Sequence, residues 1–419
     1  MTAASARLNR VLADYLAVAR SPSYFPLWLA QLVSTLGDTL HYIALVVLVF
    51  HLSGRGASVA VLVAAEILPV LLLGPIAGVI IDRVSRKNVL IASNLLRAVL
   101  ALSLVWPHGV WHAYAVAAAL SAAAVFFNPT VQAVIPGLTT PEQRLAANSV
   151  AWSTGRLVQI VGAAVAGGVI GLIGTSAAFA TNAVTFGLSA LLIVRLQVPR
   201  ETGTGSAARR GGIAGHVADI KAGLSFVRRD RFLSRFVPVQ ALASLATGGT
   251  GAMLIVLSER HLGLAPAEFA WLIGAIGLGA LIGPLVPNLF AGHHPDVRWL
   301  FVPYLIRGLG DVLIAVITPL PVALVILFIY GLNTSTGMVV QSSMLQRDVP
   351  DRVRGRVFTL LDITWNAARL LSLAGAALLV DAIGIEAVYW IGGALLAASG
   401  AIGLSLLGRT GGAERNTLV

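Results

Sequence analysis

The sequence contains no cysteine, which excludes disulfide bonds and thiolate chemistry. Charge is also scarce, because only 11% of the 419 residues are Asp, Glu, Lys or Arg, while 57% are hydrophobic. A soluble protein needs far more charge than this to cover its surface, and the mean hydropathy of +0.86 agrees. A soluble globular fold is therefore excluded.

Motifs of the common nucleotide- and metal-dependent enzymes are missing as well. There is no phosphate-binding glycine loop ending in Gly-Lys-Ser/Thr, and no His-Glu-x-x-His pair. We therefore expect no enzymatic activity, no cofactor and no metal. Residues 1–23 contain neither an apolar core nor a cleavage pattern, so we expect no cleavable signal peptide.

Apolar segments recur along the whole chain, and a segment of about 20 apolar residues is long enough to cross a bilayer. The sequence thus predicts an all-α membrane protein with twelve transmembrane helices. The predicted spans cover residues 24–50, 57–81, 88–106, 111–136, 145–171, 177–198, 231–258, 268–290, 298–317, 321–347, 354–382 and 386–408.

The 29 Lys and Arg residues outnumber the 18 Asp and Glu residues, and their positions indicate a topology. They gather at both termini and in every second loop, whereas the alternate loops hold only Arg55 and Arg260. This asymmetry follows the positive-inside rule, so both termini are expected in the cytoplasm. The net charge of +11 then reflects topology and attraction to anionic lipids, and no nucleic-acid partner is expected.

The longest polar stretch, residues 199–230, divides the spans into two sets of six. It is Gly- and Ser-rich and then basic, which predicts a cytoplasmic linker followed by an amphipathic helix. A shift of 209 residues places Gln31 on Gln240 and Gln132 on Gln341, so we expect two parallel six-helix halves with a site between them. The predicted segments are a cytoplasmic N-terminal segment 1–23, a first half 24–198, the linker 199–230, a second half 231–408 and a cytoplasmic tail 409–419.

The loop after the second span reads "GVIIDRVSRK" and carries a family pattern. Gly78, Asp82, Arg83, Arg86 and Lys87 match the loop motif of the major facilitator superfamily, which the chain resembles over its whole length. The resemblance implies a twelve-helix transporter that works by alternating access. It also implies that this loop is a gate between the halves, where Asp82 accepts hydrogen bonds from the N-terminus of a facing helix.

Within that superfamily, "LPVLLLGPIAGVIIDR", "FFNPTVQAVIPGLTTPEQRLAANS" and "RGRVFTL" are similar to the macrolide-efflux and enterobactin-exporter branch. This implies export of drugs or siderophores by proton antiport across the cytoplasmic (inner) membrane of a bacterium. The implied partners are a small-molecule substrate, protons and membrane lipids, and the protein is expected to act as a monomer. Ala163, in the fifth span, stands where drug antiporters of the superfamily usually have proline.

Two polar residues interrupt the first span in "LGDTLHYIALVVLVF". A carboxylate inside hydrocarbon costs several kcal/mol, at least about 2.5, so Asp38 is expected to face a water-filled cavity and to carry a proton or a cationic substrate. His41, three residues on, shares its helix face and could tune Asp38 or relay the proton. The alternative is that Asp38 is a hydrogen-bonded structural residue beside Gly37 and that His41 is merely solvated.

Further candidates lie in other spans. Glu66, three residues before Pro69, is a second proton-carrier candidate. Asp362 and Arg369 share one face of the eleventh span, and Arg156 in the fifth span maps onto Trp365. Arg156 could meet Asp362 or bind an anionic substrate, while Trp365 could form an aromatic wall. The alternative is a buried charge pair that stabilises one conformation.

Three other buried charges are interpreted as structural. Arg307 and Asp311 lie four residues apart on the ninth span and are expected to neutralise each other. Arg97, in the third span, lies in a helix that is peripheral in the resembled family.

The sequence leaves three functions open. The first is a secondary-active exporter of hydrophobic or amphiphilic molecules, coupled to protons through Asp38 or Glu66. The second is a lipid or lysophospholipid flippase, which would work independently of protonation. The third is a non-transporting receptor or scaffold, in which neutralising either residue would change nothing.

Overall fold

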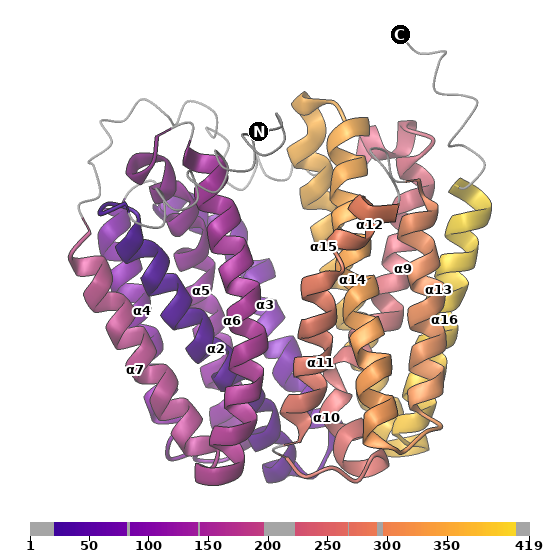
Figure 1. Ribbon diagram of the computed structural model, residues 1–419, viewed down its shortest axis with the longest axis horizontal. Coiled ribbons are helices and arrows are strands. Elements are labelled where there is room, and N and C mark those ends of the chain that lie inside the picture. Colours follow the sequence, from indigo (N-terminus) through magenta and orange to yellow (C-terminus); the bar gives the residue numbers. More distant parts are fainter. Residues whose placement is uncertain are drawn as a thin grey trace, which may run out of the picture. The chain divides into compact units, whose positions relative to one another are not determined.

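The computed structural model describes residues 21–81, 84–140, 143–196, 223–266, 268–290 and 296–407. In these ranges every regular element is a helix and no strand occurs (Figure 1). Eight of the described helices are long and apolar enough to cross a membrane, and a ninth span results when a bent pair is counted as one. The prediction of an all-α membrane protein is confirmed.

The first six predicted spans each correspond to one helix. The helices are α2 (Phe25–Ser53), α3 (Gly56–Ile81), α4 (Arg86–Ser103), α5 (Val110–Leu138), α6 (Gln143–Ile173) and α7 (Thr175–Val194). The helix α6 continues past the buried Ala163 without a break, as expected where proline is absent.

The last six predicted spans are also helical, but two of them are broken. The seventh consists of α9 (Leu233–Ala252), α10 (Leu254–Val256) and the π-helix η1 (Leu257–His261), with a bend of 46°. The eighth consists of α11 (Phe269–Ile282) and α12 (Leu285–Phe290), separated by Gly283 and Pro284. The others are α13 (Arg298–Ile314), α14 (Leu320–Asp348), α15 (Asp351–Ile383) and α16 (Ile385–Leu407).

Single glycines make the two tightest turns between long helices. Gly174 separates α6 from α7 with a φ of 94°, and Gly384 separates α15 from α16 with a φ of 88°. Side chains rarely tolerate this left-handed region, so glycine is the residue that ends one helix and allows the next to begin at once.

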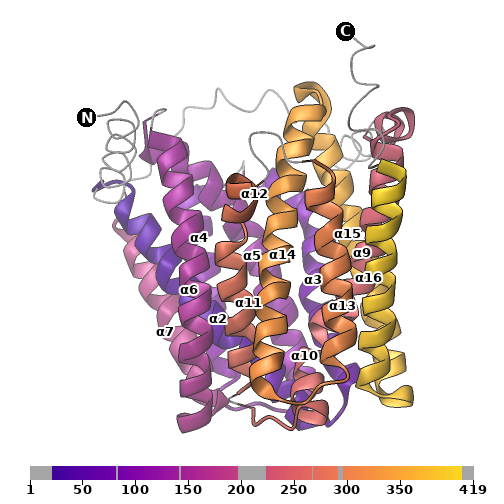
Figure 2. The ribbon, with the colours of Figure 1, turned by 45° about the vertical axis from the view of Figure 1, so that its right-hand side comes forward.

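The chain divides into two compact units, and the same helix pairs recur in both. Unit 1 contains residues 1–48 and 65–213, and unit 2 contains residues 49–64 and 214–419. In unit 1, α4 packs against α5 and α7, and in unit 2, α13 packs against α14 and α16. The views in Figures 1 and 2 both show α13 beside α16. A shift of about 209 residues relates these pairs, as expected for a repeated six-helix half.

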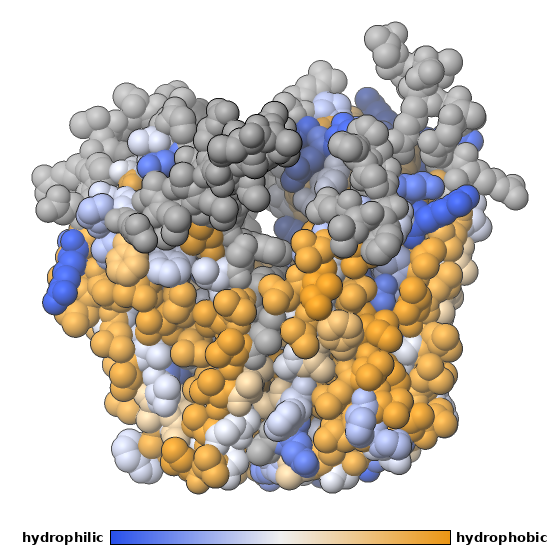
Figure 3. Space-filling view, viewed as in Figure 1, coloured by the Kyte–Doolittle hydropathy of each residue, from blue (hydrophilic) through white to orange (hydrophobic). Residues whose placement is uncertain are grey.

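Large apolar side chains remain exposed on the helices. Leu172 is 88% exposed and Leu378 is 76% exposed, values that would be costly in water. Figure 3 shows hydrophobic residues covering most of the visible helical surface of the described part. Such a surface is suited to contact with lipid chains.

Candidate functional site

The first candidate site lies within unit 1, around Asp38 on α2. The carboxylate of Asp38 interacts with the side chains of Ser34 and Asn182 and is attracted electrostatically by Arg97 on α4. Asp38 keeps an exposed side chain, whereas Arg97 is only 4% exposed. The structure thus places an exposed acid beside a buried base.

Arg97 is held by polar and aromatic contacts. Its Nη2 donates to Oδ1 of Asn94 at 2.6 Å, and Asn94 in turn donates to Ser189 at 2.9 Å. The guanidinium carbon lies 4.1 Å from the ring centre of Phe127 and 4.5 Å from that of Phe186. These contacts fix Arg97 in place, since cation–π contacts are strong where water is excluded.

Close packing of α2 on α7 brings the polar residues together. A Cβ at Gly37 would overlap side-chain oxygens of Thr185 and Asn182, so only glycine allows this approach. Thr185 also donates to the side-chain oxygen of Asn182 at 3.1 Å. The small residue before Asp38 is therefore the reason that Asn182 reaches it.

His41 lies deeper in unit 1 than Asp38 does. It is 6% exposed, its ring meets that of Phe179 edge-on at 5.2 Å, and neither ring nitrogen has a hydrogen-bond partner. No hydrogen bond joins it to Asp38 among the described residues. This burial argues against the alternative of a merely solvated His41, and its coupling to Asp38 stays a prediction.

Glu66 on α3 is partly buried. Its main-chain carbonyl accepts a hydrogen bond from Ser121 on α5 at 2.6 Å. This bond joins α5 to α3 through the main chain, so it does not engage the Glu66 carboxylate.

The second candidate site is a cavity of about 530 Å³ inside unit 2. Cavities of about 300–1,000 Å³ hold most small ligands. Three residues that the sequence singled out, Asp362, Trp365 and Arg369, line it together from α15. The opposite lining comes from α9, α13 and α14 and includes Gln240, Ser244, Tyr304, Arg307, Tyr330 and Gln341.

A hydrogen-bonded row forms part of the cavity wall. Gln240 donates to Gln341 at 2.6 Å, and the Tyr304 hydroxyl donates to the side-chain oxygen of Gln240 at 2.5 Å. Ser244 donates to the main-chain carbonyl of Trp365 at 2.6 Å, which joins α9 to α15. The sequence marks both glutamines only as positions repeated at a spacing of 209 residues, and the structure shows them in contact.

Arg307 and Asp311 lie side by side in unit 2, but no hydrogen bond joins them among the described residues. Arg307 places its guanidinium carbon 4.0 Å from the ring centre of Tyr330, and its charge is felt by Asp311. Arg307 Nε and Asp311 Oδ2 both lack hydrogen-bond partners. The mutual neutralisation that the sequence suggests is thus electrostatic, and Arg307 also lines the cavity.

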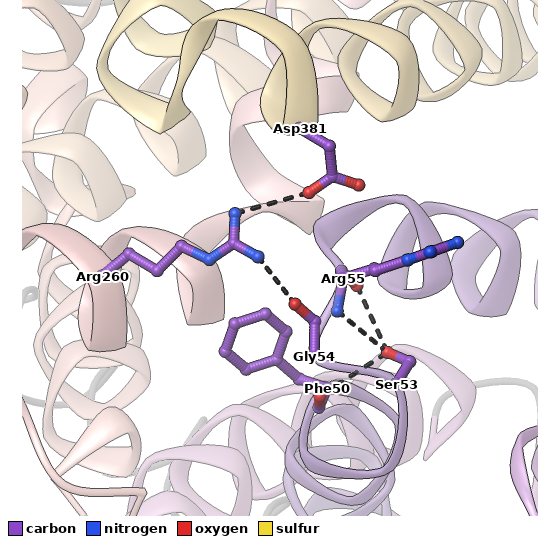
Figure 4. Close-up of polar contacts among 6 residues, drawn as sticks. All are labelled: Phe50, Ser53, Gly54, Arg55, Arg260 and Asp381. Carbon is purple, nitrogen blue, oxygen red and sulfur yellow. Dashed lines mark hydrogen bonds and ion pairs between the residues drawn. The ribbon is translucent and has the colours of Figure 1, made fainter.

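The π-helical turn η1 forms a third polar site, which the sequence did not reveal. Glu259 accepts from His51 at 3.0 Å. Arg260 donates to the carbonyl of Gly54 at 2.7 Å and pairs with Asp381 at 3.4 Å, as Figure 4 shows. The next residue, His261, contacts Glu386 on α16 at 3.0 Å and the carbonyl of Ile317 at 3.1 Å.

We call this set of contacts around residues 259–261 the η1 clasp. The clasp joins the segment between α2 and α3 to η1 and the end of α15, all within unit 2. Consecutive residues reach different partners because they point in different directions around the helix. Arg55 and Arg260, the two basic residues found in the loops that are otherwise free of Lys and Arg, both lie in this region.

The loop motif after the second span is only partly described. Asp82 and Arg83 lie outside the described residues, as do the surroundings of Gly78 in α3 and of the Arg156 side chain in α6. Arg86 donates to the Ala133 carbonyl at 3.0 Å, and Lys87 donates to the Leu196 carbonyl at 2.9 Å. Lys87 therefore sits just beyond the C-terminal end of α7, where a positive charge is favourable.

No group of three or more metal-ligating side chains occurs in the described part of the chain. Of the segments predicted from the sequence, residues 1–20, 197–222 and 408–419 lie outside the described residues. Residues 223–229 are helical and fall at the end of the predicted linker.

Comparison with known proteins gives a consistent result. The family model described as Major Facilitator Superfamily matches residues 27–258 and 236–418. Multidrug efflux pump Tap of Mycobacterium tuberculosis is 28% identical over 387 residues, which cover 88% of this chain and 90% of that protein. Macrolide efflux protein A of Streptococcus pyogenes is 22% identical over 385 residues, which cover 89% and 93%.

Solved structures share the fold. The crystal structure of the nucleoside transporter NupG superposes with a TM-score of 0.69, at 13% sequence identity, and covers 91% of this chain and 98% of that one. At this identity the likeness concerns the fold.

Proposed function

Because the chain belongs to the major facilitator superfamily and is a multi-pass membrane transporter, we propose that it exports hydrophobic or amphiphilic small molecules by proton antiport through alternating access. The two named efflux relatives support the direction of transport. We place the protein in the inner membrane of a bacterium as a monomer, with both termini in the cytoplasm.

One observation carries this proposal: the cavity of about 530 Å³ in unit 2. Three residues selected from sequence alone converge on it, and its lining combines an acid, two bases and aromatic rings. A cavity with a few polar groups among apolar ones is typical of small-molecule sites. We therefore assign substrate binding to Asp362, Trp365 and Arg369, and leave Arg156 as a further candidate.

We assign the proton to Asp38. Its exposed carboxylate can exchange a proton with water, while Arg97 remains held by Asn94 and two aromatic rings. Protonation would remove the attraction between the two charges without displacing Arg97. This change in local charge could shift the equilibrium between the inward-facing and outward-facing conformations. His41 and Glu66 are secondary candidates for the proton path.

Alternating access requires a closure at each end of the transport path. We propose that the loop motif of Gly78, Asp82, Arg83, Arg86 and Lys87 provides the cytoplasmic one. The η1 clasp would provide the other. The topology that we expect from the overall Lys and Arg asymmetry would put the loop of Arg260 on the outer side. The proposed segments are those predicted above, with two six-helix halves joined by the linker.

Proton movement in everted membrane vesicles tests this function. We expect compounds from a panel of lipophilic amines, macrolides and catechol siderophores to dissipate an acidic interior in vesicles that contain the protein. The response should disappear with Asp38→Asn and persist with Glu66→Gln. Asp38→Glu, which keeps a carboxylate, is the matched control.

The other outcomes point to specific alternatives. Loss of the response with Glu66→Gln alone would move the proton to Glu66. If no compound acts although the protein is folded, drug–proton antiport is wrong. Transport of a fluorescent lysophospholipid that is unaffected by Asp38→Asn would then identify a flippase.

A further inference from the structure

The face of α15 that lines the unit 2 cavity carries an acid, an aromatic ring and a base in that order. Asp362, Trp365 and Arg369 are spaced by three and four residues, so they point to the same side of the helix. The rise of a helix separates the first from the last by about 10 Å. Trp365 lies between them.

Within the described part of the chain, neither end of this row is neutralised by another side chain. No ion pair of Asp362 or of Arg369 is formed among the described residues, and the side chain of Asp362 is exposed. The third charge of the cavity, Arg307, differs because it is buried over the ring of Tyr330 and balanced by Asp311. The two charges that a ligand can contact, on Asp362 and Arg369, therefore cancel in sum but lie at opposite ends of the row.

The wall opposite is already engaged in its own hydrogen bonds. Gln240 uses its amide nitrogen on Gln341 and its oxygen on Tyr304. This wall contributes shape and polarity. Its charged residue in the described lining, Arg307, is already balanced by Asp311, so it is not available as a counter-charge for Asp362. The ligand must supply both counter-charges if the cavity is to be filled without an unpaired ion, which is costly away from water.

We propose that this cavity binds a zwitterionic amphiphile, with its cationic group against Asp362 and its anionic group against Arg369. The apolar middle of the ligand lies on Trp365, which offers both apolar area and a π face. The inference rests on the proposed function, because it names the substrate class of the cavity assigned there. It distinguishes this protein from a carrier of simple lipophilic cations.

Equilibrium dialysis of radiolabelled probes against the full chain in phosphatidylcholine nanodiscs tests the proposal. The probe is ω-aminooctanoate, whose extended chain spans about the same 10 Å as the helical row. Octylamine and octanoate each lack one charge, and ω-aminobutanoate and ω-aminododecanoate are shorter and longer. We expect ω-aminooctanoate to bind at least tenfold more tightly than each of these four.

The variants assign each end separately. Asp362→Asn should weaken ω-aminooctanoate binding at least tenfold and leave octanoate unchanged, which also shows that the cavity is folded. Arg369→Gln should also weaken ω-aminooctanoate binding at least tenfold, but it should leave the binding of octylamine unchanged. Asp362→Glu and Arg369→Lys keep the charges and should keep the preference for a ligand with two charged ends.

Equal binding of octylamine and ω-aminooctanoate would overturn the proposal and leave a simple cation site. Equal affinities in wild type and Asp362→Asn would also overturn it. Binding is measured without a proton gradient, so its failure is distinct from a failure of antiport. Transport of the vesicle panel together with no binding of the zwitterion would retain the exporter and reject this substrate class.

Discussion

The strongest prediction concerns the Asp38–Arg97 pair, in which one charge is buried and the other is exposed. Asp38→Asn leaves Arg97 without a counter-charge at 4% exposure. Removing one partner of a fully buried pair costs about 3–5 kcal/mol, and exposed pairs are worth about 0–1 kcal/mol. Because Asp38 is exposed while Arg97 is buried, we expect an interaction energy between these limits, about 1–3 kcal/mol.

A double-mutant cycle isolates that energy. Arg97→Met keeps an apolar side chain between Phe127 and Phe186 but leaves Asn94 without its donor. This loss is present in both the single and the double variant, so it cancels in the cycle. The double variant should therefore be more stable than the sum of the two single effects predicts, by about 1–3 kcal/mol.

The measurement is unfolding in mixed micelles titrated with SDS, followed by tryptophan fluorescence. The matched control combines Arg97→Met with Asp381→Asn, which lies in the other compact unit, and the two effects should add within about 0.5 kcal/mol. A coupling of Asp38 with Arg97 below about 0.5 kcal/mol would show that the two charges do not stabilise each other. The proton site would then have to be sought elsewhere.

Two further predictions follow from close contacts in unit 2. A Cβ on Gly331 of α14 would overlap the carbonyl oxygen of Ile276 on α11, so Gly331→Ala should cost about 1–3 kcal/mol in the same unfolding assay, and an unchanged midpoint would contradict the packing. Arg260→Gln removes one exposed ion pair and one hydrogen bond of the η1 clasp, which together stabilise it by about 1.4 kcal/mol. The open form of the clasp should therefore be populated up to about tenfold more often. Because the chain lacks cysteine, an Ala60→Cys reporter, at a site that is 3% exposed, should then react faster with a water-soluble maleimide, and an equal rate would argue against the clasp.

Several features of the fold were predictable because they depend on local sequence. The twelve predicted spans follow from apolar length, and their ends agree with described helices to within a few residues, although only eight or nine of these helices are long and apolar enough to cross a membrane. The 46° bend of the seventh span was missed, because no proline marks it and π-helical turns have no local signal of this kind. The interruption at Gly283–Pro284 could have been expected, since proline cannot continue the hydrogen bonding of a helix.

The candidate sites were predictable only in part. An ionisable residue in a span is conspicuous, so Asp38, Asp362 and Arg369 were found from their type and position. Arg97 was interpreted as structural because its helix is peripheral in the resembled family. Its pairing with Asp38 was missed because the two residues lie 59 positions apart, and spacing along one helix does not show what packs against it. The clasp residues were missed because charges in loops are common and carry no signal until their partners are known.

The sequence by itself determined the membrane location, the helical fold, the internal repeat and the family of this protein, because hydropathy and short motifs are local properties of the chain. Only the tertiary structure decided which polar groups meet. It placed Arg97 beside Asp38, joined Gln240 to Gln341, and gathered Asp362, Trp365 and Arg369 on one cavity. The physical reason is that hydrogen bonds and charge pairs act over a few ångströms, so their partners are set by how the helices pack.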